Sequence, residues 1–385
     1  MKVVLIGNYE NDVQESMKRF AASMVSGLTQ AGHDVRCVRP RSVVGQLQPS
    51  WRGVGKWLGY IDKFGVFPRD LTAALKWADV VHICDQGGSF YTKHIGSFPH
   101  IVTCHDLLAI RSALGEIPRV QTRWSGRQLQ RMILKGLNRA QHIVCVSEAT
   151  RKDLLRVTDI PHHRVSRVYN SLNYPYSRME THEAEFRLRK LSVDLNEPFL
   201  LHVGGNQWYK NRLGVLRIFA LLRNLTVGRH LKLVMVGKSW TDQMRQFVSA
   251  NGLTNLTVEL TEIVDEDLRA LYSMATMMLF PSLQEGFGWP IIEAQACGCP
   301  VVTSDRPPMD EVGGTAAIYV DPDDEKSAAA ILKSALDSAS AMRESNLQNA
   351  ARFTESAMIS GYLSAYEIVQ RRGFESRASL VANLN

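Results

Sequence analysis

The sequence predicts an α/β protein with two Rossmann-like domains, each built on a parallel sheet, that face a central cleft. At 385 residues the chain is long for a single hydrophobic core. Short apolar runs alternate with helical stretches along the chain, as in parallel sheets that helices cover on both faces. Both halves open alike, because residues 4–7 and 201–205 each form an apolar run that ends in glycine. Such a run, followed by a loop and a helix, begins a Rossmann-like unit.

The expected strands are the short apolar runs. They cover residues 3–7, 35–38, 80–84, 101–104, 143–146 and 165–169 in the first half, and 199–203, 231–236, 256–260, 277–280, 301–303 and 317–320 in the second. The polar stretch between the halves indicates an N-terminal domain over 1–173, a linker region over 174–196 and a C-terminal domain over 197–355. Ligands of such sheets bind at the carboxyl ends of the strands, so the cleft is the expected site.

The composition limits the classes of partner. A formal charge of +7 favours anionic partners such as nucleotide sugars or anionic lipid surfaces. No helix-turn-helix, RNP or zinc-finger pattern supports nucleic acid. No apolar run reaches the ~18 residues that cross a bilayer, and residues 1–7 are expected to form a strand rather than a signal peptide. Several of the six cysteines lie in apolar runs, which indicates buried free thiols in a reducing, cytoplasmic compartment.

The stretch over residues 282–293 carries the strongest chemical pattern. Two carboxylates, Glu285 and Glu293, flank a glycine-rich turn that follows the apolar run 277–280. Pro290 suits the first position of a helix, because its missing N–H would have no partner there. The expected geometry is a strand, a glycine loop with Glu285, and a helix with Glu293 in its first turn. Free N–H groups and the positive end of the helix dipole favour an anion at this point.

These residues resemble the E-x7-E signature of retaining glycosyltransferases with the GT-B fold, most closely glycosyltransferase family 4. The match continues through residues 294–305, which resemble that family's run EA-x-A-x-G-x-PVV-x-S. The resemblance reaches from Met1 to about Tyr366 and is strongest in the second half. It implies that the last segment, residues 356–385, holds a helix that crosses back to the N-terminal domain. The alternative is a solvated acidic helix start, since the dipole favours Glu there.

The resemblance also implies roles for this stretch. Glu293 would bind the ribose diol, because a carboxylate accepts parallel hydrogen bonds from neighbouring hydroxyls. Glu285 would be catalytic and hold hydroxyls of the donor sugar, and the backbone N–H groups of Gly286, Phe287 and Gly288 would hold phosphate. The family further implies a retaining reaction in which the departing phosphate takes the acceptor proton.

A second stretch, residues 201–212, resembles the donor-diphosphate loop of the same family. The family usually has a run R-K-N here, and Lys210 matches its lysine, whereas Tyr209 stands where the arginine is expected. Arg212 is a candidate for the second cation. Fixed cations lower the barrier because the leaving diphosphate gains negative charge as the glycosidic bond breaks. The predicted donor contacts here are Gly205, Asn206, Lys210 and Arg212, with Lys210 assigned to catalysis.

His105 follows the apolar run 101–104 and resembles the family's acceptor-side histidine. Polar residues at strand ends of α/β folds are often functional. We therefore expect His105 to hold sugar hydroxyls rather than to act as a base. A satisfied structural histidine is the alternative interpretation.

The first half also contains a basic segment without acidic residues between positions 119 and 139. Its basic residues recur every four positions: Arg119, Arg123, Arg127, Arg131, Lys135 and Arg139. Upstream, aromatic residues alternate with basic ones: Trp51, Arg52, Lys56, Trp57, Tyr60, Lys63, Phe64, Phe67 and Arg69. Basic residues with aromatics suit a membrane interface or a lipid-linked acceptor. The alternative is a solvated helix face beside ordinary core aromatics.

The resemblance thus implies a retaining glycosyltransferase of the hexosyltransferase class, and the residue pattern adds the expectation that it is metal-independent. It would use a UDP- or GDP-sugar as co-substrate, with no cofactor, and a hydroxyl acceptor such as a lipid-linked or cell-surface glycan precursor. Two alternatives stay open: a non-catalytic nucleotide-sugar-binding protein, which Tyr209 favours, and a GT-B nucleotide-sugar epimerase. No metal site is expected, because the acidic triplets at 265–267 and 321–323 suit a helix start and a turn.

Overall fold

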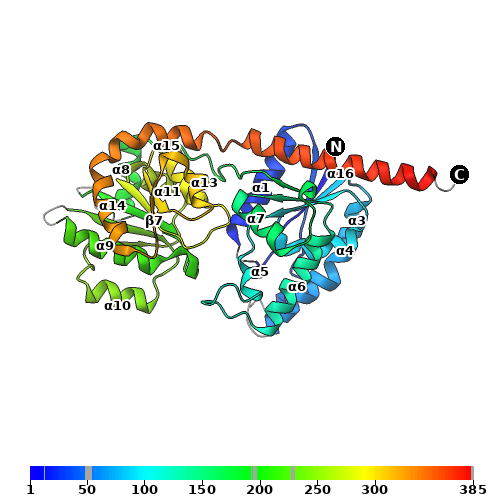
Figure 1. Cartoon of the computed structure of the whole chain (residues 1–385), viewed down its shortest axis with the longest axis horizontal. Coiled ribbons are helices and arrows are strands. Elements are labelled where there is room, and N and C mark those ends of the chain that lie inside the picture. Colours follow the sequence, from blue (N-terminus) through cyan, green and yellow to red (C-terminus); the bar gives the residue numbers. More distant parts are fainter. Residues whose placement is uncertain (13, 48–53, 192, 194–196, 227–229, 383–385) are drawn as a thin grey trace. The chain divides into compact units, whose positions relative to one another are not determined.

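The computed structural model describes residues 1–12, 14–47, 54–191, 193, 197–226 and 230–382, the side chains of residues 54 and 374–382 excepted. The chain divides into two compact units (Figure 1). Unit 1 comprises Met1–Asn173 together with Glu355–Asn385, and unit 2 comprises Tyr174–Thr354. Among the described residues, no helix combines the length and the apolar character needed to span a membrane.

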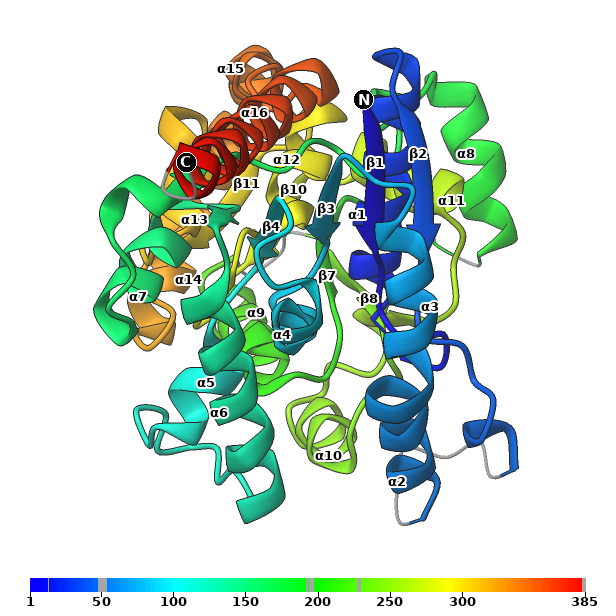
Figure 2. The same cartoon turned by 90° about the vertical axis from the view of Figure 1, so that its right-hand side faces the viewer.

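Unit 1 is a six-stranded parallel sheet in the order β2-β1-β3-β4-β5-β6. Its strands are β1 (Lys2–Ile6), β2 (Asp34–Val38), β3 (Val80–Ile83), β4 (His100–Cys104), β5 (His142–Cys145) and β6 (Val165–Arg167). Figure 2 shows β1 and β2 side by side with their arrowheads at the same end. Strands β4 and β5 are buried along their whole length, whereas the edge strand β2 is largely exposed. This explains why the inner strands are apolar runs and why β2 alternates with charged residues.

The helices of unit 1 cover both faces of this sheet (Figure 1). They are α1 (Glu15–Gln30), α2 (Val54–Ile61), α3 (Phe67–Leu75), α4 (Thr92–Ile95), α5 (Leu108–Ala113), α6 (Trp124–Arg139), α7 (Glu148–Val157) and α16 (Glu355–Ala382). Helix α16 is bound to the sheet by buried hydroxyls. Tyr366 Oη lies 2.9 Å from His82 Nδ1, and Thr103 Oγ1 donates to Tyr362 Oη at 3.1 Å. The last helix is therefore part of unit 1.

Unit 2 is also a six-stranded parallel sheet, in the order β12-β11-β10-β7-β8-β9. Its strands are β7 (Phe199–Gly204), β8 (Lys232–Gly237), β9 (Thr257–Leu260), β10 (Met277–Phe280), β11 (Val301–Ser304) and β12 (Ile318–Val320). Its helices are α8 (Thr181–Lys190), α9 (Arg212–Leu225), α10 (Asp242–Ala250), α11 (Asp265–Met274), α12 (Trp289–Ala296), α13 (Met309–Gly313), α14 (Glu325–Ser338) and α15 (Arg343–Ala350). The strand order reverses between β7 and β10, which makes this the topological switch point.

The prediction of two parallel α/β sheets is confirmed, and all twelve predicted strands are present with ends within two residues of those expected. The predicted linker over 174–196 differs from the structure, because it contains helix α8. Ala184 and Leu188 of this helix are fully buried, and Arg187 pairs with Asp267 of α11 at 3.1 Å. Buried residues at a spacing of four form an apolar stripe, so the segment belongs to unit 2.

Candidate active site

The carboxyl edge of the unit 2 sheet carries an ion pair at its switch point. Lys210 ends a short 3₁₀ turn, Trp208–Lys210, that follows β7, and Glu285 lies in the loop between β10 and α12. Lys210 Nζ donates to Glu285 Oε1 at 2.7 Å. The two side chains are only 15% and 8% exposed. Two residues that are 75 positions apart thus meet where ligands of such sheets bind.

Two aromatic rings lie near the Lys210 ammonium. Its ammonium lies 5.2 Å from the Phe280 ring centroid and 5.7 Å from that of Tyr209. The backbone N–H of Leu283 donates to the Tyr209 carbonyl at 2.7 Å and so joins the two loops. Aromatic walls lower the local dielectric, which strengthens any charge interaction made at this point.

Helix α12 begins one residue earlier than the sequence predicts. Gly288 adopts φ +96° just before the helix, so Trp289 is the first helical residue and Pro290 the second. The expectation that Glu293 lies in the first turn is therefore wrong, because it falls in the second. The reason is that Gly288 ends the loop in a left-handed conformation, which is open to glycine without strain, so that the helix begins at Trp289 instead of Pro290.

Glu293 is held inside unit 2 by a partner that the sequence analysis did not identify. Its carboxylate is 5% exposed, and the Tyr272 hydroxyl donates to Glu293 Oε2 at 3.0 Å. Tyr272 belongs to α11 and is fully buried. Burial raises the pKa of Tyr272 well above its usual range, so the hydroxyl keeps its proton. No local spacing in the sequence connects these two residues.

Arg212 does not share the partners of Lys210 and instead donates to Asn206 and to the Lys238 carbonyl. It is 4% exposed, and its Nη1 donates to Asn206 Oδ1 and, at 2.6 Å, to the Lys238 carbonyl. Asn206 Nδ2 donates to the Ser239 carbonyl at 2.7 Å. Burial lowers the pKa of Arg212. The Nε and Nη2 of Arg212 have no hydrogen-bond partner among the described residues. Arg212 therefore ties the loop after β7 to the loop after β8.

Glycines allow these two loops to approach each other. An added Cβ at Gly237, where φ is +144°, would lie 2.0 Å from the Gly204 carbonyl oxygen. Gly205 does not bear on this approach, because an added Cβ there would meet the end of the Gln207 side chain in the same loop, at 2.5 Å. His202 of β7 is fully buried, and its Nδ1 donates to the Leu279 carbonyl at 2.9 Å. Burial lowers the pKa of His202 to about 3, so a neutral imidazole ties β7 to β10.

His105 lies at the carboxyl end of β4 in unit 1. Its Nε2 donates to the Cys84 carbonyl at 2.9 Å, and its backbone N–H donates to Gln86 Oε1 at 2.8 Å. The Phe20 ring packs edge-on at 4.7 Å between centroids. Burial lowers the pKa of His105, so the ring is neutral. These are contacts of a structural histidine, and its Nδ1 is the nitrogen that accepts hydrogen bonds in this tautomer.

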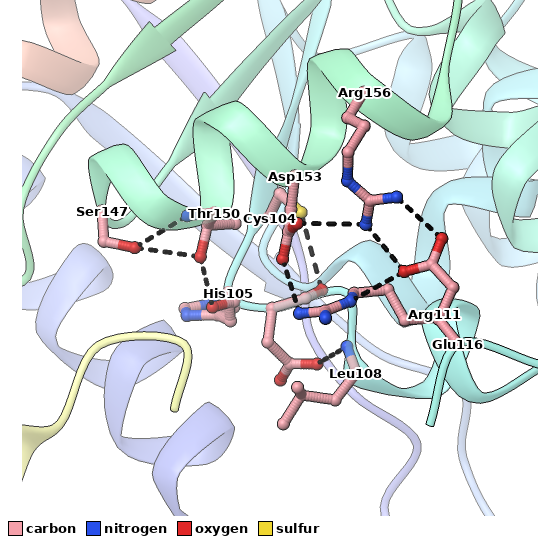
Figure 3. A network of polar contacts seen from close by, with 10 residues as sticks. Cys104, His105, Leu108, Arg111, Glu116, Ser147, Thr150, Asp153 and Arg156 are labelled. Carbon is pink, nitrogen blue, oxygen red and sulfur yellow. Dashed lines mark hydrogen bonds and ion pairs between the residues drawn. The ribbon is translucent and has the colours of Figure 1, made fainter. Parts of the chain in front are cut away.

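A polar network holds the segment that follows His105 (Figure 3). Thr150 Oγ1 donates to the His105 carbonyl at 3.4 Å. Figure 3 shows two arginines of α5 and α7 pointing toward two carboxylates: Arg111, Arg156, Glu116 and Asp153. The shortest of these ion pairs, between Arg156 and Glu116, measures 2.7 Å. The network fastens α5 to α7 behind the His105 loop.

Aspartates of the two acidic triplets, 265–267 and 321–323, form ion pairs with arginines, and the cysteines are free. Asp267 pairs with Arg187, and both Asp321 and Asp323 pair with Arg306, at 3.0 and 2.7 Å. All six cysteines are free thiols, and only Cys37 is exposed. In the described part of the chain, no three His, Cys, Asp or Glu side chains gather as metal ligands would.

The predicted basic stripe is exposed, and α6 carries its last four cations, whereas Arg119 and Arg123 lie in the segment before the helix. The exposed cations are Arg119, Arg123, Arg127, Arg131, Lys135 and Arg139. Trp124, between them, is 74% exposed, and Ile133 and Leu137 face the core. Of the upstream aromatics, Trp57 is exposed but Phe67 is buried in the core of unit 1. The interface interpretation of Phe67 is therefore wrong, because it packs on Tyr91 at 4.9 Å. Trp51 and Arg52 lie outside the described residues.

The chain is similar to known proteins in sequence and in fold. Residues 17–174 match the family model described as Glycosyltransferase Family 4, and residues 184–353 match the model described as Glycosyl transferases group 1. The O-antigen chain mannosyltransferase B of Escherichia coli is 28% identical over 240 residues, which are 62% of this chain and 61% of that protein. The O-antigen chain mannosyltransferase RfbU of Salmonella typhimurium is 31% identical over 201 residues, 51% of this chain and 52% of that protein.

The matched part thus spans less than two thirds of either relative. Among solved structures, Anabaena Alr3699/HepE in complex with UDP and glucose superposes with a TM-score of 0.72 at 15% identity. The superposition covers 95% of this chain and 99% of that one. At such low identity this similarity shows the fold alone, which is GT-B.

Proposed function

Because the chain belongs to glycosyltransferase family 4 and is a glycosyltransferase of the GT-B type, we propose that it transfers a sugar from a nucleotide-sugar donor to an acceptor hydroxyl with retention of configuration. The observation that carries this proposal is the Lys210–Glu285 pair at the switch point of unit 2. A cation and a carboxylate fixed at this edge suit a phosphate and sugar hydroxyls, respectively.

We assign the donor to the carboxyl edge of unit 2. Glu293 binds the ribose hydroxyls, and Glu285 holds hydroxyls of the transferred sugar. The backbone of residues 286–288, at the positive end of α12, faces the phosphates. The donor is a UDP- or GDP-sugar. Mannose is the first sugar to test, since two relatives are O-antigen mannosyltransferases.

Lys210 stabilises the leaving diphosphate. In the structure its charge is neutralised by Glu285 at 2.7 Å. As the glycosidic bond breaks, negative charge grows on the phosphate and the ammonium gains a second anionic partner. A charge of this kind in a partly water-excluded site contributes about 10²–10³ in rate. Gly205, Asn206 and Arg212 shape the loop that presents Lys210, and Arg212 does so from the side of the loop after β8.

We assign the acceptor to unit 1. His105 contributes its Nδ1 to sugar hydroxyls, and the departing phosphate takes the acceptor proton. The reaction needs no metal, because Lys210 and the dipole of α12 supply the positive charge. The acceptor is a lipid-linked or cell-surface glycan precursor.

We also propose a peripheral contact with the inner face of an anionic membrane through α6. The support is charge complementarity: its basic face is exposed, and Trp124 projects from the same face. Arg123, Arg127 and Arg131 have no ion-pair partner among the residues described. Cations beside an exposed indole suit the headgroup region of a bilayer.

Mass analysis of product tests the function. The chain is incubated with UDP-, GDP- and ADP-sugars, with and without an extract of lipid-linked or free glycan acceptors. We expect transfer with one donor, only with acceptor, and unchanged in EDTA. A changed nucleotide sugar without acceptor would identify an epimerase, and binding without any product would identify a non-catalytic protein. Activity lost to EDTA and restored by Mg²⁺ or Mn²⁺ would contradict metal independence.

A further inference from the structure

The hydrogen bond between Tyr272 and Glu293 joins two elements of unit 2. Tyr272 lies on α11 and Glu293 on α12, and the hydroxyl donates to Oε2 at 3.0 Å. The tyrosine is fully buried and the carboxylate is 5% exposed. A hydrogen bond to an ionised carboxylate is about twice as strong as one between neutral groups. The contact is therefore strong enough to fix the orientation of the carboxylate.

Tyr272 is itself held in place from the other side. The Tyr176 ring packs against it edge-on, at 5.7 Å between centroids and 85° between planes. Tyr176 is buried in turn, and its hydroxyl donates to Asp265 Oδ1 at 3.4 Å. The Cys297 thiol, just after α12, donates to the Ser177 carbonyl. The segment before α8 therefore clamps the tyrosine onto the same region as Glu293.

A carboxylate needs such an anchor to recognise a diol. The terminal torsion of a glutamate side chain is broad, so a free carboxylate samples many orientations. Two neighbouring hydroxyls bind well only when the lone pairs of the carboxylate face both of them. Tyr272 uses one of about four acceptor positions and fixes the rest.

We propose that Tyr272 is a positioning residue that orients Glu293 and so makes the donor site select ribonucleotides over 2′-deoxyribonucleotides. This inference rests on the proposed role of Glu293 in donor binding. Tyr272 does not touch the nucleotide. It acts only through the orientation of the Glu293 carboxylate, so its loss relaxes selection at the ribose and leaves phosphate binding by Lys210 in place.

The test measures the affinities of UDP, 2′-deoxy-UDP, GDP and 2′-deoxy-GDP by calorimetry for the full chain and its Tyr272→Phe variant. The original chain should bind the better ribonucleotide at least tenfold more tightly than its deoxy analogue. In Tyr272→Phe this ratio should fall by about tenfold, equivalent to about 1.4 kcal/mol. An unchanged ratio in Tyr272→Phe would overturn the inference.

Tyr366→Phe is the matched control. Tyr366 is another fully buried tyrosine, its hydroxyl 2.9 Å from His82 Nδ1, and it lies in unit 1. Both variants should lose stability, but only Tyr272→Phe should change the ratio. An equal change in Tyr366→Phe would assign the effect to general destabilisation and contradict the inference.

A second variant keeps the test decisive if Tyr272→Phe folds poorly. Glu293→Gln should also lose the selection, and adding Tyr272→Phe to it should change the ratio no further, because both act through one carboxylate. Additive effects would contradict the inference. If the original chain binds none of the four nucleotides, the donor assignment itself fails. If it binds and selects normally but Tyr272→Phe does so too, only the role of Tyr272 fails.

Discussion

Unit 1 and unit 2 share a parallel α/β architecture and both bury charged side chains, Asp62 and Asp85 among them in unit 1, but they place their cations differently. Unit 2 encloses charged side chains at the carboxyl edge of its sheet, where Lys210, Glu285, Glu293 and Arg212 are all largely buried. The buried titratable side chains of unit 1 include histidines with lowered pKa, whereas its basic stripe is exposed, on α6 and in the segment before it.

This difference indicates a division of work. A charge in a partly water-excluded place acts strongly on a ligand charge that arrives beside it. Exposed cations act weakly and are screened over ~8 Å at physiological ionic strength. Changes at the edge of unit 2 should therefore alter turnover strongly, and changes on α6 should alter association weakly and in a salt-dependent way.

The largest effect should follow from Glu285→Gln. The amide oxygen still accepts from Lys210, so the fold should remain, but the charge that holds sugar hydroxyls is lost. We expect kcat to fall by about 10²–10³. Glu266→Gln on α11 is the control, because Glu266 bonds Tyr174 and Arg269 in the same unit. Near-normal kcat in Glu285→Gln would remove the catalytic role and weaken the contrast between units.

Lys210→Met should lower kcat by about 10², and more than it weakens binding of the free nucleoside. It also leaves Glu285 buried without its cation, which should cost about 3–5 kcal/mol of unfolding free energy. Adding Glu285→Gln should restore much of that stability, as measured by chemical denaturation.

Arg212→Met should mainly loosen the loops after β7 and β8. If Arg212→Met lost kcat severely and Lys210→Met only mildly, Arg212 would be the cation that stabilises the leaving diphosphate, and the assignment to Lys210 would be wrong.

Acid should destabilise unit 1 more than unit 2. Histidines with a lowered pKa are His82, His94, His100, His105 and His142 in unit 1, and His202 in unit 2. Burial sets the pKa of His82 and His202 to about 3 and that of His142 to about 4. Below pH 6.5 the unfolded chain binds protons that the folded chain does not, so stability falls as pH drops toward those values.

His82, His142 and His202 each lower the free energy of unfolding by at most about 1.4 kcal/mol per pH unit in this window. Amide hydrogen exchange at pH 7 and pH 5 separates the units, because each peptide belongs to one of them. After correction for the slower intrinsic exchange at pH 5, protection should be lost first in β3, β4 and β5. Equal loss of protection in both sheets would contradict the contrast in buried histidines.

The smallest effect should be membrane association. Each basic residue near an anionic surface contributes roughly 1 kcal/mol, so α6 should give weak binding that falls steeply with salt. Co-sedimentation with anionic vesicles measures it. Replacing Arg127, Arg131 and Lys135 by Gln should abolish most of it, whereas replacing Lys326 and Lys333 of α14 should not. Absence of binding at low salt would make the stripe a plain solvated face.

The sequence predicts those features that depend on local patterns. Apolar runs such as 277–280 locate the strands to within two residues, because burial on both faces demands continuous apolar sequence. The glycine loop between Glu285 and Glu293 locates the candidate site because its glycines and both carboxylates stand close together in the sequence. What the sequence does not predict depends on contacts across the fold. Tyr272 lies 21 positions from Glu293, and only the packing of α11 on α12 brings them together.

The start of α12 shows a second limit. Pro290 permits a first helical position, but the left-handed Gly288 places the helix start at Trp289. Whether a glycine adopts that conformation depends on the loop around it. The sequence therefore predicts a helix that starts one residue too late, with Glu293 in its first turn and not in its second. Likewise, Arg212 is adjacent to the donor loop in sequence but bonds the loop after β8, because the first turn of α9 directs it there.

Amide hydrogen exchange with and without saturating UDP or GDP tests the central claim most directly, namely that the charged edge of unit 2 is the donor site. We expect nucleotide to slow exchange most in residues 205–211 and 281–288, the loops that carry Lys210 and Glu285. Lys210→Met should reduce that protection. The strongest protection in unit 1, or none in either loop while nucleotide binds, would contradict the account.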